Sequence, residues 1–335
     1  MKKIYPGNTG IKFVITGLFL LVAHLIFFNL FLPLNSAGKW KEVWIPHGAS
    51  YTHGINILKK EGIVKNEFIF HVIGKITGIE TDLKAGYYNL NTSMSPWNVF
   101  GYLRKGLIVQ HRITIPEGFD LNSIKPKFID TGLISDEAWQ IVYDRDFLEL
   151  LDINAPSLEG YLYPDTYRFA KGMRPRDIFR MMVQRLRQHF DQKLLKRAEE
   201  VGMSEREVIT LASIIEKEVI YNSERPLVSA VYNNRLKRNM RLQADPTVNY
   251  GVLKKGNSIT RSDLKRVTPY NTYAIYGLPP GPIASPGIRS IRAALNPADT
   301  DYLFFVSKNN GFHHFSRTGI EHMKAVMIYQ RGGGS

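Results

Sequence analysis

Two glutamates, Glu216 and Glu218, stand on either side of Lys217 near the end of an apolar run that follows Ser204. At about 100° per residue in a helix, the two carboxylates lie on opposite margins of the apolar face. A carboxyl in such a place is partly removed from water, which raises its pKa and lets it hold a proton near neutral pH. It can then serve as a general acid and base. Two solvated surface glutamates are the alternative interpretation.

The segment 204–219 is predicted to be the helix that carries these carboxylates. Ser204 and Glu207 have the spacing of a capping box, in which each side chain bonds the backbone amide of the other residue. Apolar residues then recur at helical spacing and predict one stripe that faces a core. They are Val208, Leu211, Ala212, Ile215 and Val219.

Neutral hydrogen-bonding groups gather downstream of this helix, in segments 241–250 and 270–273, which are predicted to be irregular. They are Gln243, Asp245, Thr247, Asn249, Tyr250, Asn271 and Tyr273. Amides, hydroxyls and aromatic faces in one cleft suit a saccharide, which presents hydroxyls and apolar C–H faces. Hydrolytic glycosidases need two carboxylates. If only one is poised, the substrate must supply the second function. In peptidoglycan the 6-hydroxyl of N-acetylmuramic acid can do so, by closing a 1,6-anhydro ring.

Other catalytic chemistries are not favoured by the sequence. The histidines form no His-Glu-x-x-His motif, and adjacent His313 and His314 point to opposite sides of a predicted β-strand, so no metal site is expected. There is no Gly-x-Ser-x-Gly elbow and no Gly-rich phosphate loop. The absence of cysteine excludes disulfides and thiolate catalysis. We therefore expect no cofactor.

The charge and the N-terminal sequence indicate where the protein works. A formal net charge of +14 calls for an anionic partner or surface, but no nucleic-acid-binding motif is present, so nucleic acid is not expected. Residues 13–33 are almost continuously apolar, and about 20 such residues span a bilayer. Lys2, Lys3 and Lys12 precede this span. The positive-inside rule then puts residues 1–12 in the cytoplasm and the bulk of the protein outside.

The predicted fold class is α+β, with the transmembrane helix followed by two domains. Residues 40–110 are predicted to form a small α/β domain and residues 111–330 the catalytic domain, built around the glutamate-bearing helix. In the second domain we expect one long basic helix over 174–200 and a buried β-strand over 302–306 paired with 313–316. A stiff, packed loop is expected over 277–287. Residues 331–335 resemble a linker or tag remnant.

Five motifs, in this order, resemble the endolytic murein transglycosylase family (MltG, YceG-like). They are Glu159-Gly-Tyr-Leu-Tyr-Pro-Asp-Thr-Tyr167, Leu211-Ala-Ser-Ile-Ile-Glu-Lys-Glu218, Arg241-Leu-Gln-Ala-Asp-Pro-Thr-Val248, Tyr270-Asn-Thr-Tyr273 and Gly277-Leu-Pro-Pro-Gly-Pro-Ile283. The resemblance covers nearly the whole chain and makes 40–110 a LysM-like region. It implies a single-pass inner-membrane enzyme with its catalytic domain in the cell-wall compartment. Such enzymes cut N-acetylmuramic acid–β-1,4–N-acetylglucosamine bonds within nascent glycan strands, leave 1,6-anhydro ends and work beside peptidoglycan synthases.

The resemblance also assigns roles to residues. Its catalytic acid/base matches Glu218, although Val219 stands where other lytic transglycosylases usually have Ser or Thr. Glu216 becomes a supporting residue, paired with an arginine or with neighbours of Lys217, or an alternative acid. The predicted substrate-binding residues are Gln243, Asp245, Thr247, Tyr250, Asn271, Tyr273, Pro279 and Pro280. Two other classes stay open: a peptidoglycan hydrolase that uses Asp245 or Glu216 as its second carboxylate, and a non-catalytic wall-binding or scaffold protein.

Overall fold

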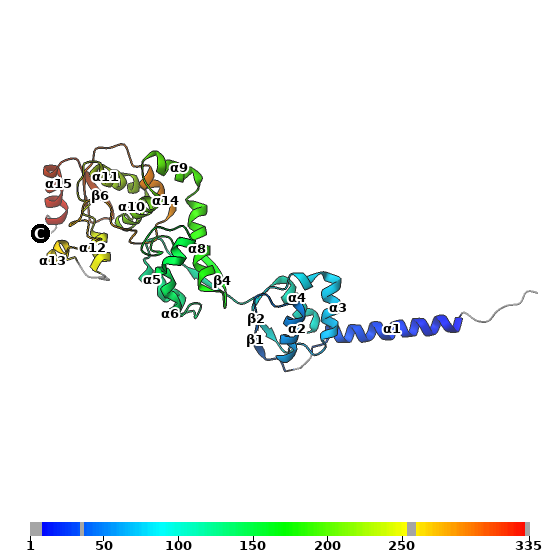
Figure 1. Cartoon of the computed structure of the whole chain (residues 1–335). Coiled ribbons are helices and arrows are strands. Elements are labelled where there is room, and N and C mark those ends of the chain that lie inside the picture. Colours follow the sequence, from blue (N-terminus) through cyan, green and yellow to red (C-terminus); the bar gives the residue numbers. More distant parts are fainter. Residues whose placement is uncertain (1–8, 34–36, 253–258, 332–335) are drawn as a thin grey trace, which may run out of the picture. The chain divides into compact units, whose positions relative to one another are not determined.

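The computed structural model describes residues 9–33, 37–252 and 259–331 (Figure 1). Most of the predicted cytoplasmic segment and of the predicted linker lies outside them. The chain divides into two compact units: Met1–His111 with Arg168–Met173, and Arg112–Tyr167 with Arg174–Ser335. The division falls within two paired β-strands, β3 (Gln110–Thr114) and β4 (Thr166–Ala170). Helices and small sheets occur in both units, which confirms the α+β class.

One helix among the described residues is long and apolar enough to cross a membrane. This is α1 (Thr9–Phe31), whose segment Lys12–Phe31 has a mean hydropathy of 2.3 and is not buried within the protein. Asn29 donates its side-chain amide to the Leu25 carbonyl at 2.8 Å. This polar side chain is therefore bonded within its own helix, as an apolar environment requires.

The rest of the first unit is a two-stranded antiparallel sheet packed against helices. Val43 pairs with Tyr88 across the strands, and both are buried in the core together with Ile55 and Phe100. Ser50 caps the helix between 51 and 60 by accepting from the His53 amide, which fixes where it begins. The elements are β1 (Trp40–Ile45), α2 (Tyr51–Lys60), α3 (Glu67–Thr77), η1 (Ile79–Thr81), β2 (Gly86–Asn91) and α4 (Pro96–Lys105).

The second unit begins with short helices and corrects one prediction. The single helix expected over 174–200 is wrong, because the chain forms α8 (Pro175–His189) and α9 (Gln192–Glu200). The break lies at Phe190, whose ring is buried, and the next residue, Asp191, caps α9 by accepting from the Leu194 amide at 3.1 Å. The preceding elements are α5 (Leu121–Ile129), α6 (Asp136–Trp139), η2 (Gln140–Tyr143) and α7 (Arg145–Leu150).

The glutamate-bearing helix is α10 (Glu205–Glu218), and its predicted capping box is confirmed. Ser204 Oγ accepts from the Glu207 amide at 3.3 Å, and Glu207 Oε2 accepts from the Ser204 amide at 2.8 Å. The expectation of a single buried stripe was too narrow, because every residue from 208 to 215 is buried. The surrounding helices explain this burial. They are α9, α11 (Arg225–Lys237), α12 (Asp245–Val252) and α14 (Ile288–Leu295).

Two further predictions need correction downstream of α10. The segment 241–250 is not irregular throughout, because α12 starts at Asp245, with Pro246 in its first turn and Thr247 Oγ1 donating to the Ala244 carbonyl. The predicted buried β-strand starts only at Phe304 and is half-buried. The remaining elements are η3 (Asn222–Glu224), α13 (Arg261–Lys265), β5 (Phe304–Ser307), β6 (His313–Ser316), α15 (Gly319–Val326) and η4 (Met327–Arg331).

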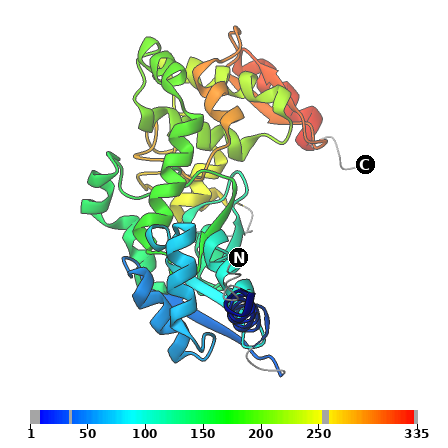
Figure 2. The ribbon, with the colours of Figure 1, turned by 90° about the vertical axis from the view of Figure 1, so that its right-hand side faces the viewer.

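The end of the second unit is a hairpin and a packed loop. β5 and β6 pair antiparallel and contact α15; these elements are drawn in red at one end of the unit in Figure 2. The loop over 277–287 is packed as expected, since residues 281–287 are all buried. Its Ile283 amide donates to Ser213 Oγ of α10 at 3.0 Å. This contact fixes the loop against the helix that carries Glu218.

Candidate active site

Glu218 is the last residue of α10 and lies half-buried where the helix ends. Its Oε1 accepts a hydrogen bond of 2.7 Å from the hydroxyl of Tyr232, a fully buried residue of α11. Because α10 is enclosed by other helices up to Ile215, its final turn is held firmly while this carboxyl emerges from the packed interior. The Glu218 carboxyl therefore has a fixed position and is partly accessible to solvent.

The surroundings of Glu218 favour its protonated form near neutral pH. Removal from water raises the pKa of this carboxyl to about 7, and the negative charge of Asp245 adds to the rise. The Tyr232 hydrogen bond and the positive charge of Arg235 act in the opposite direction, because both favour the carboxylate. A carboxyl with a pKa of about 7 can both give and take a proton at neutral pH, as general acid–base catalysis requires.

Glu216 has a different environment from Glu218. Its Oε1 receives a 2.6 Å ion pair from Arg225 Nη2, and its Oε2 accepts from the Gly287 amide at 3.0 Å. Both side chains of the ion pair are only 6% exposed. The buried guanidinium and the backbone amide hold this carboxylate in place. This arrangement suits a structural role, joining α10 to the starts of α11 and α14, better than that of an alternative acid.

Three of the predicted substrate-binding residues lie near Glu218 and are open to solvent. Tyr273 donates its hydroxyl to Asp245 Oδ1 at 2.6 Å, and the Glu218 charge raises the pKa of Tyr273, while the Asp245 charge raises that of Glu218. Gln243 has a positive φ of 49°, and its exposed amide oxygen lies 3.4 Å from Arg235 Nη1. Together these side chains offer amide, hydroxyl and carboxylate groups around one acid.

Other predicted binding residues have their polar atoms bonded inside the protein. Thr247 is fully buried and bonds the Ala244 carbonyl and the Thr272 hydroxyl. Asn271 is 1% exposed, and its Nδ2 donates to backbone carbonyls of the preceding loop. These bonds shape the loops that hold Gln243 and Tyr273. A direct role for Thr247 and Asn271 in binding stays a prediction.

The remaining predicted residues belong to a neighbouring cluster. Tyr250 donates its hydroxyl to Glu159 Oε2 at 3.2 Å, and its ring lies 4.8 Å from that of Tyr270. Glu159 also accepts from the Leu121 amide at 3.1 Å and is 3% exposed. Burial raises the pKa of Glu159 to about 8. In the adjoining loop Pro279 is buried and Pro280 is exposed.

Three functional candidates were missed by the sequence analysis: Tyr232, Arg235 and Glu159. Tyr232 and Arg235 are three residues apart on α11, a spacing that places both on one helix face but does not by itself indicate a site. Arg235 is nearly buried and donates to the carbonyls of Leu242 (2.8 Å) and Leu303 (2.7 Å). It thereby ties the Gln243 loop and the segment before β5 to the helix that carries Tyr232.

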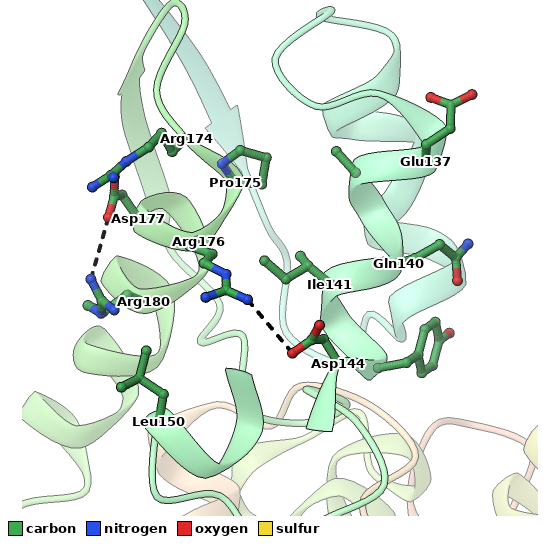
Figure 3. Close-up of a pocket in the computed structure, with 12 residues that line it drawn as sticks. Glu137, Gln140, Ile141, Asp144, Leu150, Arg174, Pro175, Arg176, Asp177 and Arg180 are labelled. Atoms are coloured by element: carbon green, nitrogen blue, oxygen red, sulfur yellow. Dashed lines mark hydrogen bonds and ion pairs between the residues drawn. The ribbon is translucent and has the colours of Figure 1, made fainter. Parts of the chain in front are cut away.

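A separate cavity of about 820 Å³ lies between η2 and the start of α8 (Figure 3). Five of its charged lining residues form ion pairs: Arg176 approaches Asp144 at 3.9 Å, and Asp177 binds Arg174 and Arg180. None of the predicted site residues lines it. The cavity is therefore separate from the predicted site around Glu218.

The fold and site together define a class of protein. A half-buried carboxyl at the end of a buried helix, bordered by amide and hydroxyl groups, is an arrangement that can exchange a proton with a polar ligand. Among the residues that the structure describes, no group of three or more His, Asp or Glu is arranged to hold a metal ion.

The chain belongs to the YceG-like family, whose model matches residues 43–327. The endolytic murein transglycosylase of Bacillus subtilis (strain 168) is 34% identical over 304 residues, which cover 85% of this chain and 83% of that protein. The endolytic murein transglycosylase of Streptococcus pneumoniae serotype 2 (strain D39) is 29% identical, and its match covers 85% of this chain and 61% of that longer protein. The 2.6 Å crystal structure of a YceG-like protein from Listeria monocytogenes superposes with a TM-score of 0.59. It is 33% identical and covers 86% of this chain and 100% of that one.

Proposed function

We propose that this protein is an endolytic lytic transglycosylase of peptidoglycan, with Glu218 as its acid/base. The observation that carries the proposal is the environment of this one carboxyl: half-buried, bonded to Tyr232 at 2.7 Å and with its pKa raised to about 7. Membership of the YceG-like family and the names of the relatives supply the reaction and the substrate.

The proposed reaction needs one carboxyl and one hydroxyl of the substrate. Glu218, as the acid, protonates the oxygen of the β-1,4 bond between N-acetylmuramic acid and N-acetylglucosamine while the bond to C1 breaks. The resulting carboxylate takes the proton of the muramic acid 6-hydroxyl as that oxygen bonds to C1. The products are a 1,6-anhydro end and a free 4-hydroxyl, no water is consumed, and Glu218 ends protonated as it began.

The residues around Glu218 have distinct proposed tasks. Gln243, Asp245 and Tyr273 contact sugar hydroxyls or acetamido groups, because they are the solvent-accessible polar groups next to the acid. The tightly packed loop that contains Pro279 and Pro280 shapes one wall. Tyr232 and Arg235 stabilise the carboxylate that forms in the first step, since both favour the charged form of Glu218.

One other reaction has a structural basis. Asp245 is close enough to Glu218 to raise its pKa, and a second carboxylate is what a hydrolase would use to activate water. Glu216 is a poor candidate for that role because Arg225 and the Gly287 amide already bind it. The hydrolase would leave reducing ends, which are heavier than anhydro ends by one water.

The N-terminal part has a proposed supporting role. We propose that α1 is a single-pass anchor in the plasma membrane, with the N-terminus in the cytoplasm and the rest outside. The unit from β1 to α4 is the proposed LysM-like, wall-binding part. In this setting the enzyme would cut glycan strands as synthases extend them and so end their elongation. The net charge of +14 suits anionic peptide stems and lipid head groups.

The test is mass spectrometry of purified glycan strands after incubation with the full-length protein in detergent. Wild type is expected to release anhydro-ended fragments from within the strands, and Glu218→Gln none. Reducing ends from wild type would favour the hydrolase, and Asp245→Asn would then identify the second carboxylate. A Glu218→Gln protein that still forms anhydro ends would disprove the assignment of the acid.

A further inference from the structure

Two stacked aromatic rings lie on the surface just beyond the catalytic helix. Tyr221 follows Glu218 by three residues, and Phe312 lies in the turn between β5 and β6. Their ring centroids are 4.1 Å apart with an angle of 15° between the planes. Tyr221 is 42% exposed and Phe312 39% exposed, so the pair presents apolar surface to solvent.

The backbone keeps Tyr221 close to the acid. Val219 and Tyr221 are extended, with φ and ψ of −111° and 140° and of −96° and 130°. Three extended residues cover at most about 11 Å. Val219 between them is buried, which anchors this short segment. The ring pair is therefore within reach of the sugar units that adjoin a bond held at Glu218.

A buried carboxylate fixes the two rings against each other. Glu224 accepts from the His313 backbone amide through Oε1 at 2.8 Å, and its Oε2 lies 2.8 Å from His313 Nδ1. Glu224 is 5% exposed and lies in the turn that follows Tyr221, while His313 directly follows Phe312. This two-point contact joins the segments that carry the stacked rings and so holds the rings against each other.

Two more contacts support the same arrangement. Gly311 has a φ of +84°, and a Cβ there would lie 2.7 Å from Cε2 of Tyr221, so the hairpin backbone packs directly on the ring. On its other side the hairpin reaches the acid through Phe305, whose ring lies 5.9 Å from Tyr232 and 5.2 Å from His313. The ring pair is thus held to the Glu218 site along the chain and through the hairpin.

We propose that Tyr221 and Phe312 form a saccharide-stacking platform that binds a sugar unit of the glycan strand next to the cleaved bond. The proposal deepens the proposed function and rests on it. Sugars offer apolar C–H faces that pack on aromatic rings, and preordered rings bind at low entropic cost. The platform contributes to the affinity for the glycan strand and takes no part in the proton transfers, which Glu218 carries out.

The experiment measures binding and turnover separately, with the full-length protein in detergent. Binding of purified uncrosslinked glycan strands is followed in the Glu218→Gln background, where strands are not cut. Adding Tyr221→Ala or Phe312→Ala should weaken binding about tenfold, as expected for the loss of one aromatic contact. Tyr221→Phe keeps the ring and should bind normally. Tyr143→Ala, which removes a 51% exposed tyrosine elsewhere in the same unit, serves as the surface control.

In the otherwise wild-type protein, Tyr221→Ala and Phe312→Ala should raise KM with little change in kcat. Equal strand binding by the alanine variants and their background would overturn the platform, and so would an equal loss in Tyr221→Phe. The failure of the proposed function has a different signature, because wild type itself would then release no anhydro ends. Unchanged melting temperatures in the alanine variants are required for either conclusion.

Discussion

Tyr232 donates its hydroxyl to Glu218 Oε1 across 2.7 Å, from the buried face of one helix to the last residue of another. The bond favours the carboxylate, whereas removal from water and the charge of Asp245 favour the acid. The balance leaves the pKa of Glu218 at about 7. The contributions of Tyr232 and Asp245 can each be removed by a single substitution, and they shift the pKa of Glu218 in opposite directions.

The pH profile of kcat/KM should report this balance. Glu218 must be protonated in the free enzyme, so activity should fall as pH rises through about 7. Tyr232→Phe removes a contact that lowers the pKa and should move this limb to higher pH. Asp245→Asn removes a negative charge that raises the pKa and should move it to lower pH. Rates of anhydro-end formation across pH 5 to 9 measure the position of this limb in each variant. Shifts in the same direction in the two variants would contradict the assignment of Glu218 as the acid.

The two glutamates of α10 should respond differently to the same isosteric change. Glu216→Gln leaves the buried Arg225 guanidinium unpaired, so we expect a loss of about 3 to 5 kcal/mol in the free energy of unfolding. Glu218→Gln removes no ion pair and should abolish activity without loss of stability. Denaturant unfolding monitored by circular dichroism measures the stability of both variants, and the rate of anhydro-end formation measures the activity of Glu218→Gln.

The matched control for Glu216→Gln is Glu200→Gln. Glu200 pairs with Arg197 at 3.0 Å with both side chains well exposed, and such a pair contributes about 1 kcal/mol or less. A loss in Glu216→Gln no greater than in this control would mean that the buried ion pair is not structural.

Glu159 should make stability depend on pH. Its pKa is raised from 4.5 to about 8 in the folded protein, so the folded state binds more protons than the unfolded state between these values. Stability therefore falls as pH rises from about 4.5 to about 8 and is level on either side. In Glu159→Gln this contribution should vanish, and the variant should lose less stability than wild type between pH 5 and pH 8. Melting temperatures at the two pH values test this, and parallel behaviour of the two proteins would disprove it.

Gly160 should not tolerate a side chain. Its φ is +79°, and a Cβ would lie 2.4 Å from Cβ of Pro282 in the packed loop. Gly160→Ala combines backbone strain of about 1 to 3 kcal/mol with this clash. Gly132→Ala is the control, because Gly132 has a φ of +65° with open space around it and reports the strain alone. Equal losses of stability in the two variants would show that the loop moves aside freely.

Local sequence patterns predicted a structural feature correctly where the residues that form it are close together in the sequence. Ser204 and Glu207 predicted the start of α10 because both halves of a capping box lie within one turn. The break at Phe190 and Asp191 was missed, although Asp191 is an ordinary N-cap, because apolar and basic residues continue on both sides of it. Composition alone also did not separate Gln243, which is exposed, from Thr247 and Asn271, which are buried.

The missed partners of Glu218 share a physical cause. Tyr232 reaches Glu218 from a different helix, and this contact depends on how α10 and α11 pack rather than on any spacing along the chain. For Glu216 an arginine was one of the expected partners, but the sequence did not indicate that the arginine is Arg225 or that the Gly287 amide also binds this carboxylate.

The division inside β3 and β4 has a consequence for limited proteolysis. The chain passes between the two units three times, and the short return segment Arg168–Met173 belongs to the first unit. In that segment Lys171 donates its amide to the Val109 carbonyl at 2.9 Å and pairs with Glu42. After a single cut near residue 111 the two fragments are still held together by the non-covalent contacts of Lys171 with Val109 and Glu42, and a truncation that starts there removes these partners. Separating the two units completely requires three cuts, or one cut in a protein whose 168–173 turn has been redesigned.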